Sequence, residues 1–246
     1  MSVEAMTELL EAGVHYGHQT KRWNPRMRDF ILEEKNSIHI IDLSKTVEQL
    51  TKAGEFLADI SGRGGKILFV GCKKQAQEAV KEAAQACGQY YVNQRWLGGT
   101  LTNLVTIRKS VSKLRDFEAL EKSAGFNKIN KAEASALRRE ATRIRHNLEG
   151  VLDMDKQPDV IVIIDTVKET IAVAEARRLG IPIVAIVDSN SNPEEINYPI
   201  AGNDDAIRAI RIILQKLVDV IAKSRVGARA PIVAPTETEE LVAVAE

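Results

Sequence analysis

One stretch of the chain combines side chains suited to contact with a nucleic acid. Residues 91–103 read YVNQRWLGGTLTN, in which a cation and an indole precede two adjacent glycines. Arginine and tryptophan offer charge and a stacking face, and glycine lets a backbone approach a phosphate closely. The alternative is a turn in which the indole fills the core and the cation pairs with a carboxylate. The candidate RNA contacts in this stretch are Arg95, Trp96, Gly98, Gly99, Thr100 and Asn103.

A second group of cations and rings lies near the N-terminus. Residues 14–28 read VHYGHQTKRWNPRMR, and residues 21–28 hold four cations and no acid. Cations beside aromatic rings in a loop favour contact with RNA, although lone histidines are usually structural and the tryptophan could anchor the core. The candidates here are His15, His18, Lys21, Arg22, Trp23 and Arg26.

The formal charge is zero, with 34 basic and 34 acidic residues, but the charges are segregated. Residues 108–149 hold eleven cations against six acids, whereas the last twenty residues hold four acids and one arginine. Such segregation is expected if one face meets a polyanion. Arg108 and Lys109 are the RNA candidates in the basic segment, and the alternative for its other cations is a solvated helix face.

Carboxylates follow successive predicted strands and indicate a metal site. Asp165 and Asp188 end two consecutive strands, and Asp204 and Asp205 follow the next, so these side chains should meet at one edge of a parallel sheet. Oxygen ligands suit Mg²⁺, and the addition of His18 or His15 suits Zn²⁺. We expect Asp188, Asp204, Asp205 and His18 as ligands of a structural divalent ion. The alternative is that Asp204 caps the last helix and Asp188 forms an Asx-turn.

Several enzyme classes lack their motifs. The glycine-rich residues 62–66 precede a strand, whereas nucleotide-binding loops follow one, and the turn at Gly71 lacks the spaced glycines of a dinucleotide site. No GxSxG, HExxH or Cys/His nucleophile pattern is present. Cys72 and Cys87 lack CxxC spacing and are expected to be reduced core thiols. A metal-dependent enzyme that uses the strand-end carboxylates remains a rival function, as does a pure protein-docking adaptor.

The elements that must position these residues alternate between strand and helix. Apolar strands near residues 67–70, 159–164, 181–187 and 198–201, with a further strand before the 91–103 run, alternate with helices at 74–86 and up to 179. Strands that are apolar on both faces predict a parallel sheet of about five strands, covered on both sides. Before it we expect a helix at 2–12, strands at 30–32 and 38–41, and a helix capped by Ser44 that runs to about Ile60.

The pattern predicts an inserted element and a tail. Narrow apolar stripes at spacings of three and four in residues 104–114 and 137–151 predict an antiparallel helical hairpin, a coiled coil over 104–151. It divides an α/β domain made of 1–103, with its N-terminal extension, and 152–226. A last helix should run from the Asp204 cap to about Arg225, and the acidic 227–246 is expected to be disordered. No apolar run is long enough to span a bilayer and no signal peptide is visible, so a cytoplasmic protein is expected.

Several long motifs together resemble one known family. The run YVNQRWLGGTLTN, IID at 163–165, GIPIVAIVDSN at 180–190, INYPIAGNDDA at 196–206 and AGVHYGHQTKRWNPRM at 12–27 are similar to bacterial small-subunit (30S) ribosomal proteins of family two. The likeness runs in family order from about Ala5 to Arg225. One small departure is Cys72, which stands where the family has a small hydroxyl residue.

The resemblance implies a flavodoxin-like sheet with an inserted hairpin and a structural, non-enzymatic role in translation. The family lies between head and body of the small subunit and binds 16S ribosomal RNA beside other small-subunit proteins. It is associated with recruitment of the large family-one ribosomal protein, which captures messenger RNA. By this resemblance we expect a monomer within the ribosome, with no membrane contact and no catalytic cofactor.

Overall fold

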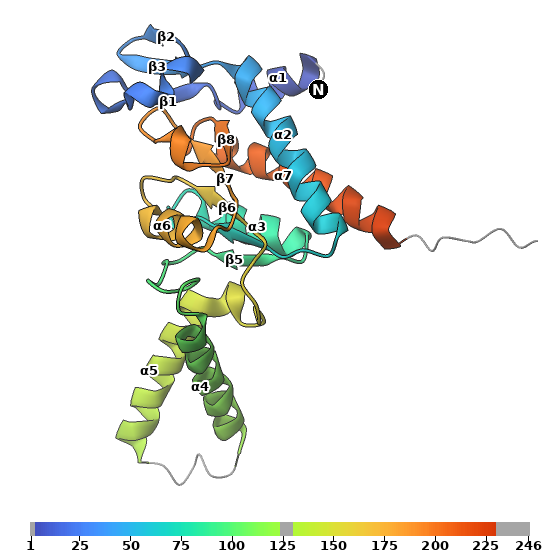
Figure 1. The fold of residues 1–246 in the computed structure, drawn as a ribbon. Helices are drawn as coiled ribbons and strands as arrows, with labels where there is room; N and C mark the ends of the chain where they lie inside the picture. Colours follow the sequence, from blue (N-terminus) through green and yellow to red (C-terminus); the bar gives the residue numbers. More distant parts are fainter. Residues whose placement is uncertain (1–2, 124–129, 230–246) are drawn as a thin grey trace, which may run out of the picture.

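The central feature of the structure, a computed structural model that describes residues 3–123 and 130–229, is a parallel sheet of five strands (Figure 1). Its strand order is β5-β4-β6-β7-β8, which in chain order is the 2-1-3-4-5 arrangement of flavodoxin-like folds. The predicted doubly wound α/β fold is therefore confirmed. The strands are β4 (Ile67–Val70), β5 (Tyr90–Val92), β6 (Val160–Ile164), β7 (Ile183–Val187) and β8 (Tyr198–Ala201).

The strands form because their residues can be buried on both faces. Every residue of β4, β6 and β7 is buried, and β-branched side chains predominate in them. Within β6, Val160, Val162 and Ile164 enter one core cluster, while Ile161 and Ile163 enter the other. Full burial of such a side chain stabilises the fold by about 1.5–3 kcal/mol, so two dry layers hold the sheet between them.

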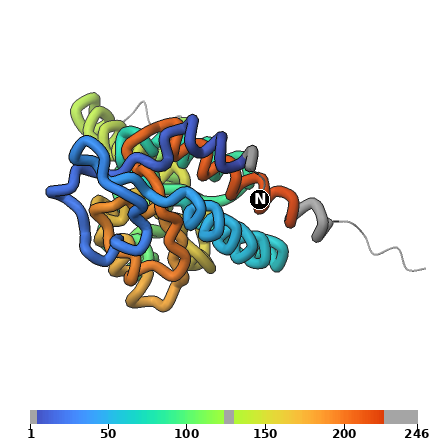
Figure 2. The backbone as a smooth tube through the Cα atoms, turned by 90° about the horizontal axis from the view of Figure 1, so that it is seen from above, coloured from blue at the N-terminus to red at the C-terminus, as the bar shows by residue number. Residues whose placement is uncertain are grey.

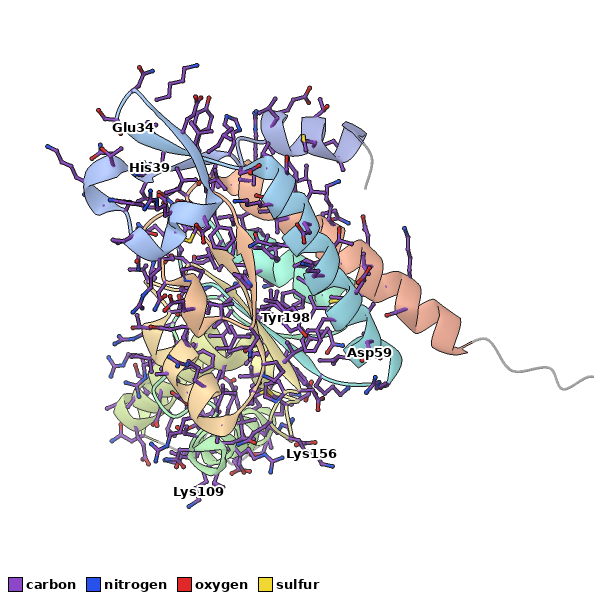
Figure 3. All side chains as sticks on the ribbon, turned by 45° about the horizontal axis from the view of Figure 1, so that its top comes forward. Glu34, His39, Asp59, Lys109, Lys156 and Tyr198 are labelled. Carbon is purple, nitrogen blue, oxygen red and sulfur yellow. The ribbon has the colours of Figure 1, made fainter. Side chains whose placement is uncertain are left out.

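Helices cover both faces of the sheet. One face carries α1 (Val3–Glu11), α2 (Leu43–Gly62), α3 (Gln77–Ala86) and α7 (Ile207–Arg229), and the other carries α6 (Thr170–Leu179). Figure 2 shows α1, α2 and α7 side by side, in agreement with their contacts. In Figure 3, Tyr198 of β8 lies against α2, where its ring stacks on Phe56 at a centroid distance of 4.2 Å.

Two helix starts differ from the sequence prediction. The cap of α2 is Asp42, whose Oδ1 accepts a hydrogen bond from the Ser44 N–H at 2.9 Å, so Ser44 is not the cap. At the start of α7, Asn203 Oδ1 accepts from the N–H groups of Asp205 and Ala206. The Asp204 carboxylate instead accepts a hydrogen bond from the Lys73 ammonium at 2.7 Å. The prediction failed because adjacent Asp, Asn and Ser residues are all good caps, and only packing decides between them.

The N-terminal extension forms a second, antiparallel sheet of order β1-β3-β2. Its strands are β1 (Tyr16–Gln19), β2 (Ile31–Lys35) and β3 (Ile38–Ile41), with the 3-10 helices η1 (Thr20–Arg22) and η2 (Pro25–Phe30) between β1 and β2. Asn36 and Ser37, at φ 53° and 60°, make the two-residue turn between β2 and β3. The sequence predicted these two strands but treated β1 as a loop.

The predicted helical hairpin is present as α4 (Leu104–Lys122) and α5 (Lys131–Leu148), which project from the sheet edge (Figure 1). Ile107, Val111 and Leu114 are the buried stripe of α4. The short helices η4 (Glu149–Val151) and η5 (Pro193–Glu195) precede β6 and β8. Helix α7 ends at Arg229, beyond the predicted end near Arg225, and the rest of the predicted acidic tail lies outside the described residues.

Candidate nucleic-acid interface and strand-end cluster

The β5 loop, residues 93–103, folds around the carboxylate of Glu175 on α6. Five donors reach its two oxygens at 2.7 to 3.1 Å: the indole N–H of Trp96, the backbone N–H groups of Gly99, Leu101 and Thr102, and the Thr102 hydroxyl. Successive backbone N–H groups that converge in this way form an anion-binding nest. The anion in this nest is a side chain of the protein itself.

The hydrogen bonds keep Glu175 ionised although it is buried. Burial by itself would raise the pKa of this carboxyl, but donation from Thr102, Gly99, Trp96 and Leu101 outweighs it and lowers the pKa below the ordinary value. Charge-assisted hydrogen bonds are about twice as strong as neutral ones, so the loop is fixed by its contacts with this single side chain.

The candidates in the β5 loop divide into an inner and an outer set. Trp96 is 7 % exposed and Thr100 is 1 % exposed, so neither presents a free face to a partner. Trp96 is therefore a core residue, which was the alternative to a stacking role. Arg95, Gly98 and Asn103 are exposed, while Gly99 is half-buried and its N–H is already used by Glu175.

Arg95 is the exposed cation of the β5 loop. No ion pair of Arg95 is found within residues 3–123 and 130–229, which removes the alternative of a structural pair with a carboxylate there. Arg95 is adjacent in sequence to Trp96, whose indole is held by Glu175, so the backbone that carries Arg95 is fixed on one side. A cation on a fixed loop that has no ion pair in the described parts of the chain is suited to an external phosphate.

Lys21 and Arg22 form an exposed pair in η1. The segment is held down because Ser189, which follows β7, accepts the His18 N–H on its hydroxyl and the Asn24 N–H on its carbonyl, each at 2.8 Å. A Cβ at Gly17 would lie 2.9 Å from the Ser189 hydroxyl, so the close approach requires glycine. The basic extension is therefore tied across the end of β7.

Other candidates of the extension have partners inside the protein. Arg26 Nε lies 3.1 Å from a carboxylate oxygen of Glu194, although both side chains are exposed. The ring of Trp23, 37 % exposed, lies 5.2 Å from that of His39. His15 packs on Tyr16, and burial lowers the pKa of its imidazole, which favours the neutral form.

On the hairpin, Arg108 and Lys109 are both exposed near the start of α4. Arg108 lies 3.5 Å from Asp155, and the Lys109 side chain extends from the hairpin base (Figure 3). Further along, Arg138 pairs with Glu121 across the two helices, as Arg145 does with Glu118. Two arginines of α5 thus bind carboxylates of α4 rather than an external partner, in line with the solvated-face alternative.

The strand-end cluster consists of Lys73, Asp165, Asp188, Asp204, Asp205 and His18, which lie at the carboxyl ends of β4, β6, β7 and β8 and on β1. The Lys73 Nζ lies 3.2 Å from Asp165, 2.7 Å from Asp204 and 2.6 Å from Asp205. Burial would lower the pKa of Lys73, but the hydrogen bonds from its carboxylate partners raise it. An internal ammonium therefore occupies the edge where this fold class binds ligands.

His18 brings the extension into this cluster. Its Nδ1 lies 3.0 Å from Asp188 and its Nε2 lies 3.3 Å from Asp205, and the hydrogen bond with Asp188 raises its pKa. Burial and the charges of Asp188 and Asp165 raise the pKa of Asp204 to about 7, although Lys73 opposes the shift. Neither alternative holds among the described residues. The Asp204 carboxylate accepts from Lys73 rather than from an N–H of α7. The Asp188 carboxylate accepts from the N–H groups of Ser189 and Asp204, not from that of Asn190 as an Asx-turn requires.

Cys72 and Glu169 lie at the topological switch point, the place between β4 and β6 where the strand order reverses and where this fold class binds ligands. The Cys72 N–H donates to Glu169 at 3.0 Å, and burial beside this carboxyl raises the pKa of the thiol to about 12. The thiol is thus protonated and has little nucleophilic character. Both cysteines are free and buried, as predicted.

The sequence profile of the family described as ribosomal protein S2 matches residues 9–224. The chain belongs to the ribosomal protein S2 family. Its role is that of a structural protein of the small ribosomal subunit in translation, and it is not an enzyme. This non-enzymatic role of the S2 family agrees with the structure, because Cys72, Lys73 and Glu169 occupy the switch point where enzymes of this fold class bind their ligands. None of the helices in the described parts of this S2-family chain has the length and apolar character needed to cross a membrane.

Sequence reasoning missed Glu175 and Lys73 of this S2-family protein. Glu175 had a detectable signal, since it lies on the buried stripe of α6 beside Ala172 and Ala176, where an acidic residue needs donors. Lys73 had none, because its partners Asp165, Asp204 and Asp205 lie far along the chain and only the fold brings them together.

Proposed function

We propose that this S2-family protein binds 16S ribosomal RNA between the head and body of the small subunit, in the cytoplasm, through separate basic patches. The observation that carries the proposal is the exposed Arg95, which has no ion pair among the described residues and lies on a loop fixed by Glu175. The extension would add Lys21, Arg22, Trp23 and Arg26, and the hairpin base would add Arg108 and Lys109. His15 and His18 would support the extension from inside. Gly98 and Asn103 would approach the backbone beside Arg95, whereas Trp96, Gly99 and Thr100 would support the loop from inside. One monomer per subunit is expected.

The test is occupancy of small subunits by Arg95→Ala and by the Lys21→Ala/Arg22→Ala pair, measured by co-sedimentation across a salt series. We expect lower occupancy and a shallower salt dependence, by about one unit of slope per lost phosphate contact. Lys52→Ala is the matched control, because Lys52 is exposed on α2 and, among the described residues, forms an ion pair only with Glu48. Unchanged occupancy of the patch variants, with folded protein, would overturn the proposal.

We also propose that the small N-terminal sheet helps to recruit the family-one ribosomal protein. What supports this is the exposure of large apolar side chains there: Leu32 is 66 % exposed and Tyr16 is 50 % exposed. Replacement of Leu32 by Ser should reduce family-one protein on the subunit without loss of the S2-family protein, and Leu179→Ser on α6 is the control. If the family-one protein binds the isolated S2-family protein without RNA, and binds the Arg95→Ala variant equally well, a pure docking adaptor is favoured.

Our third proposal is a structural divalent cation held by His18, Asp188 and Asp204. One ligand atom of each lies within 4.8 Å of the others, and the buried Asp204 Oδ2 has no hydrogen-bond partner among the described residues. Mixed nitrogen and carboxylate donors favour Zn²⁺ over Mg²⁺, and the cation would tie the extension to the sheet. Asp205, which already binds Lys73, would be a further ligand.

Metal content of the purified protein and calorimetry with ZnCl₂ test this site. We expect one Zn²⁺ per chain, and loss of binding in the His18→Ala/Asp188→Asn variant. His146→Ala is the control, since His146 is exposed on α5. Absence of stoichiometric binding to the folded wild-type chain would refute the site.

A further inference from the structure

We propose that Glu175 is the positioning residue of the RNA interface: its carboxylate holds the β5 loop in the conformation that presents Arg95. This inference rests on the proposed RNA contact of Arg95. It assigns a function to a residue that itself is 8 % exposed and cannot reach RNA.

The first argument is the density of contacts. Glu175 accepts hydrogen bonds from four residues of the loop, which are spread from Trp96 to Thr102. It is itself anchored on a helix that packs against the sheet. Gly99 adopts a φ of 90°, which directs its N–H to the carboxylate and is a conformation that glycine adopts readily. The loop backbone is therefore shaped around this oxygen pair.

The second argument is the absence of another anion or cation in the nest. No ion pair of Glu175 occurs within the described parts of the chain, so its charge is balanced by the loop donors alone. A neutral glutamine at this position would keep one acceptor oxygen. Its amide NH₂ would replace the other oxygen and face the loop donors, which would then have no acceptor. Such a replacement keeps the size of the side chain and removes its function.

The third argument concerns what the loop presents. Arg95 precedes the first anchored residue, Trp96, and Gly98 lies exposed between two anchored positions. A loop that is ordered before binding loses less conformational freedom when it meets its partner, so affinity rises without any new contact. Loss of the hydrogen bonds between Glu175 and the loop should therefore weaken the contact that Arg95 makes with RNA.

The experiment is a double-mutant cycle of Glu175→Gln and Arg95→Ala in the full chain, with small subunits lacking the protein as the probe. We expect each single variant to lower affinity about tenfold and the salt slope by about one, and the double variant to lose no more than either. Val173→Ala, a core change on the same helix, is the control for lost stability.

A second readout isolates the loop. In a Trp23→Phe background the emission of Trp96 reports its indole N–H bond, and we expect it to shift in Glu175→Gln but not in Val173→Ala. Additive effects of Arg95 and Glu175, or an unchanged Trp96 signal, would overturn the positioning role. If Arg95→Ala alone leaves affinity unchanged while the Trp96 signal shifts, the RNA contact of Arg95 fails and Glu175 acts only on the fold.

Discussion

Glu175 is an example of a single buried charge that the backbone stabilises without a cation. A buried carboxylate normally requires a partner, since its desolvation costs several kcal/mol. Here the peptide dipoles of the β5 loop provide the stabilisation, with an indole and a hydroxyl. The loop and the carboxylate stabilise each other, because the loop N–H groups would also be unsatisfied without it.

The pH dependence of stability follows from the direction of this pKa. The folded pKa of Glu175 lies below its ordinary value of 4.5, so the unfolded chain binds the proton more tightly. Its stabilisation is fully present above pH 4.5 and is lost as the pH falls through the folded pKa. In urea unfolding, wild type should lose stability over this acid range more steeply than Glu175→Gln.

At neutral pH the same variant should be less stable than wild type by about 2–3 kcal/mol, because several buried donors lose part of their acceptor. The difference between the two proteins should narrow on acidification. A gap of constant size from pH 7 to the acid range would show that the charge of Glu175 does not contribute.

At the scale of elements, the hairpin is joined to the sheet by close packing at η4. A Cβ at Gly150 would lie 2.2 Å from the carbonyl oxygen of Tyr91 and 2.5 Å from the first ring carbon of that residue. Backbone and a buried ring cannot yield easily, so the element requires glycine for lack of space rather than for an unusual φ.

Gly150→Ala should therefore destabilise the protein by about 1–3 kcal/mol and move the hairpin relative to β5. The measurement is chemical denaturation, together with hydrogen exchange of β5. Gly62→Ala at the end of α2 is the control, because nothing lies within 4 Å of its added methyl group. Equal stability of the two variants would contradict the close packing at Tyr91.

The elements that the sequence could predict are those with a strong local signal. The continuous apolar strands β6 and β7 and the stripe of α4 follow from periodicity alone. Strand β1 (Tyr16–Gln19), which pairs with β3, lacks such a pattern. The segment around it is anchored by hydrogen bonds from His18 and Asn24 to Ser189, more than 160 residues along the chain. The sequence identified the candidate RNA contacts by their residue types. It could not show which of them are exposed, because exposure depends on tertiary contacts such as that between Trp96 and Glu175.

For the whole molecule, the two core clusters show that the hairpin is not an independent appendage. Its base contributes Ile107, Val111 and Leu148 to the cluster that contains β6, β7 and Trp96. Its outer part is held by Leu114, Ala141 and the interhelical pairs, away from the sheet. The predicted boundary at 104–151 therefore cuts through a shared core.

Two deletions test this division of the hairpin. Replacement of residues 117–138 by a short Gly/Ser linker leaves the shared core in place, so the melting temperature should stay within a few degrees of wild type. Replacement of 104–151 removes at least three buried large side chains, each worth about 1.5–3 kcal/mol, and should lower it sharply or prevent folding. Equal melting temperatures would show instead that the sheet and its helices are stable without the hairpin base, and that the insertion is a separate folding unit.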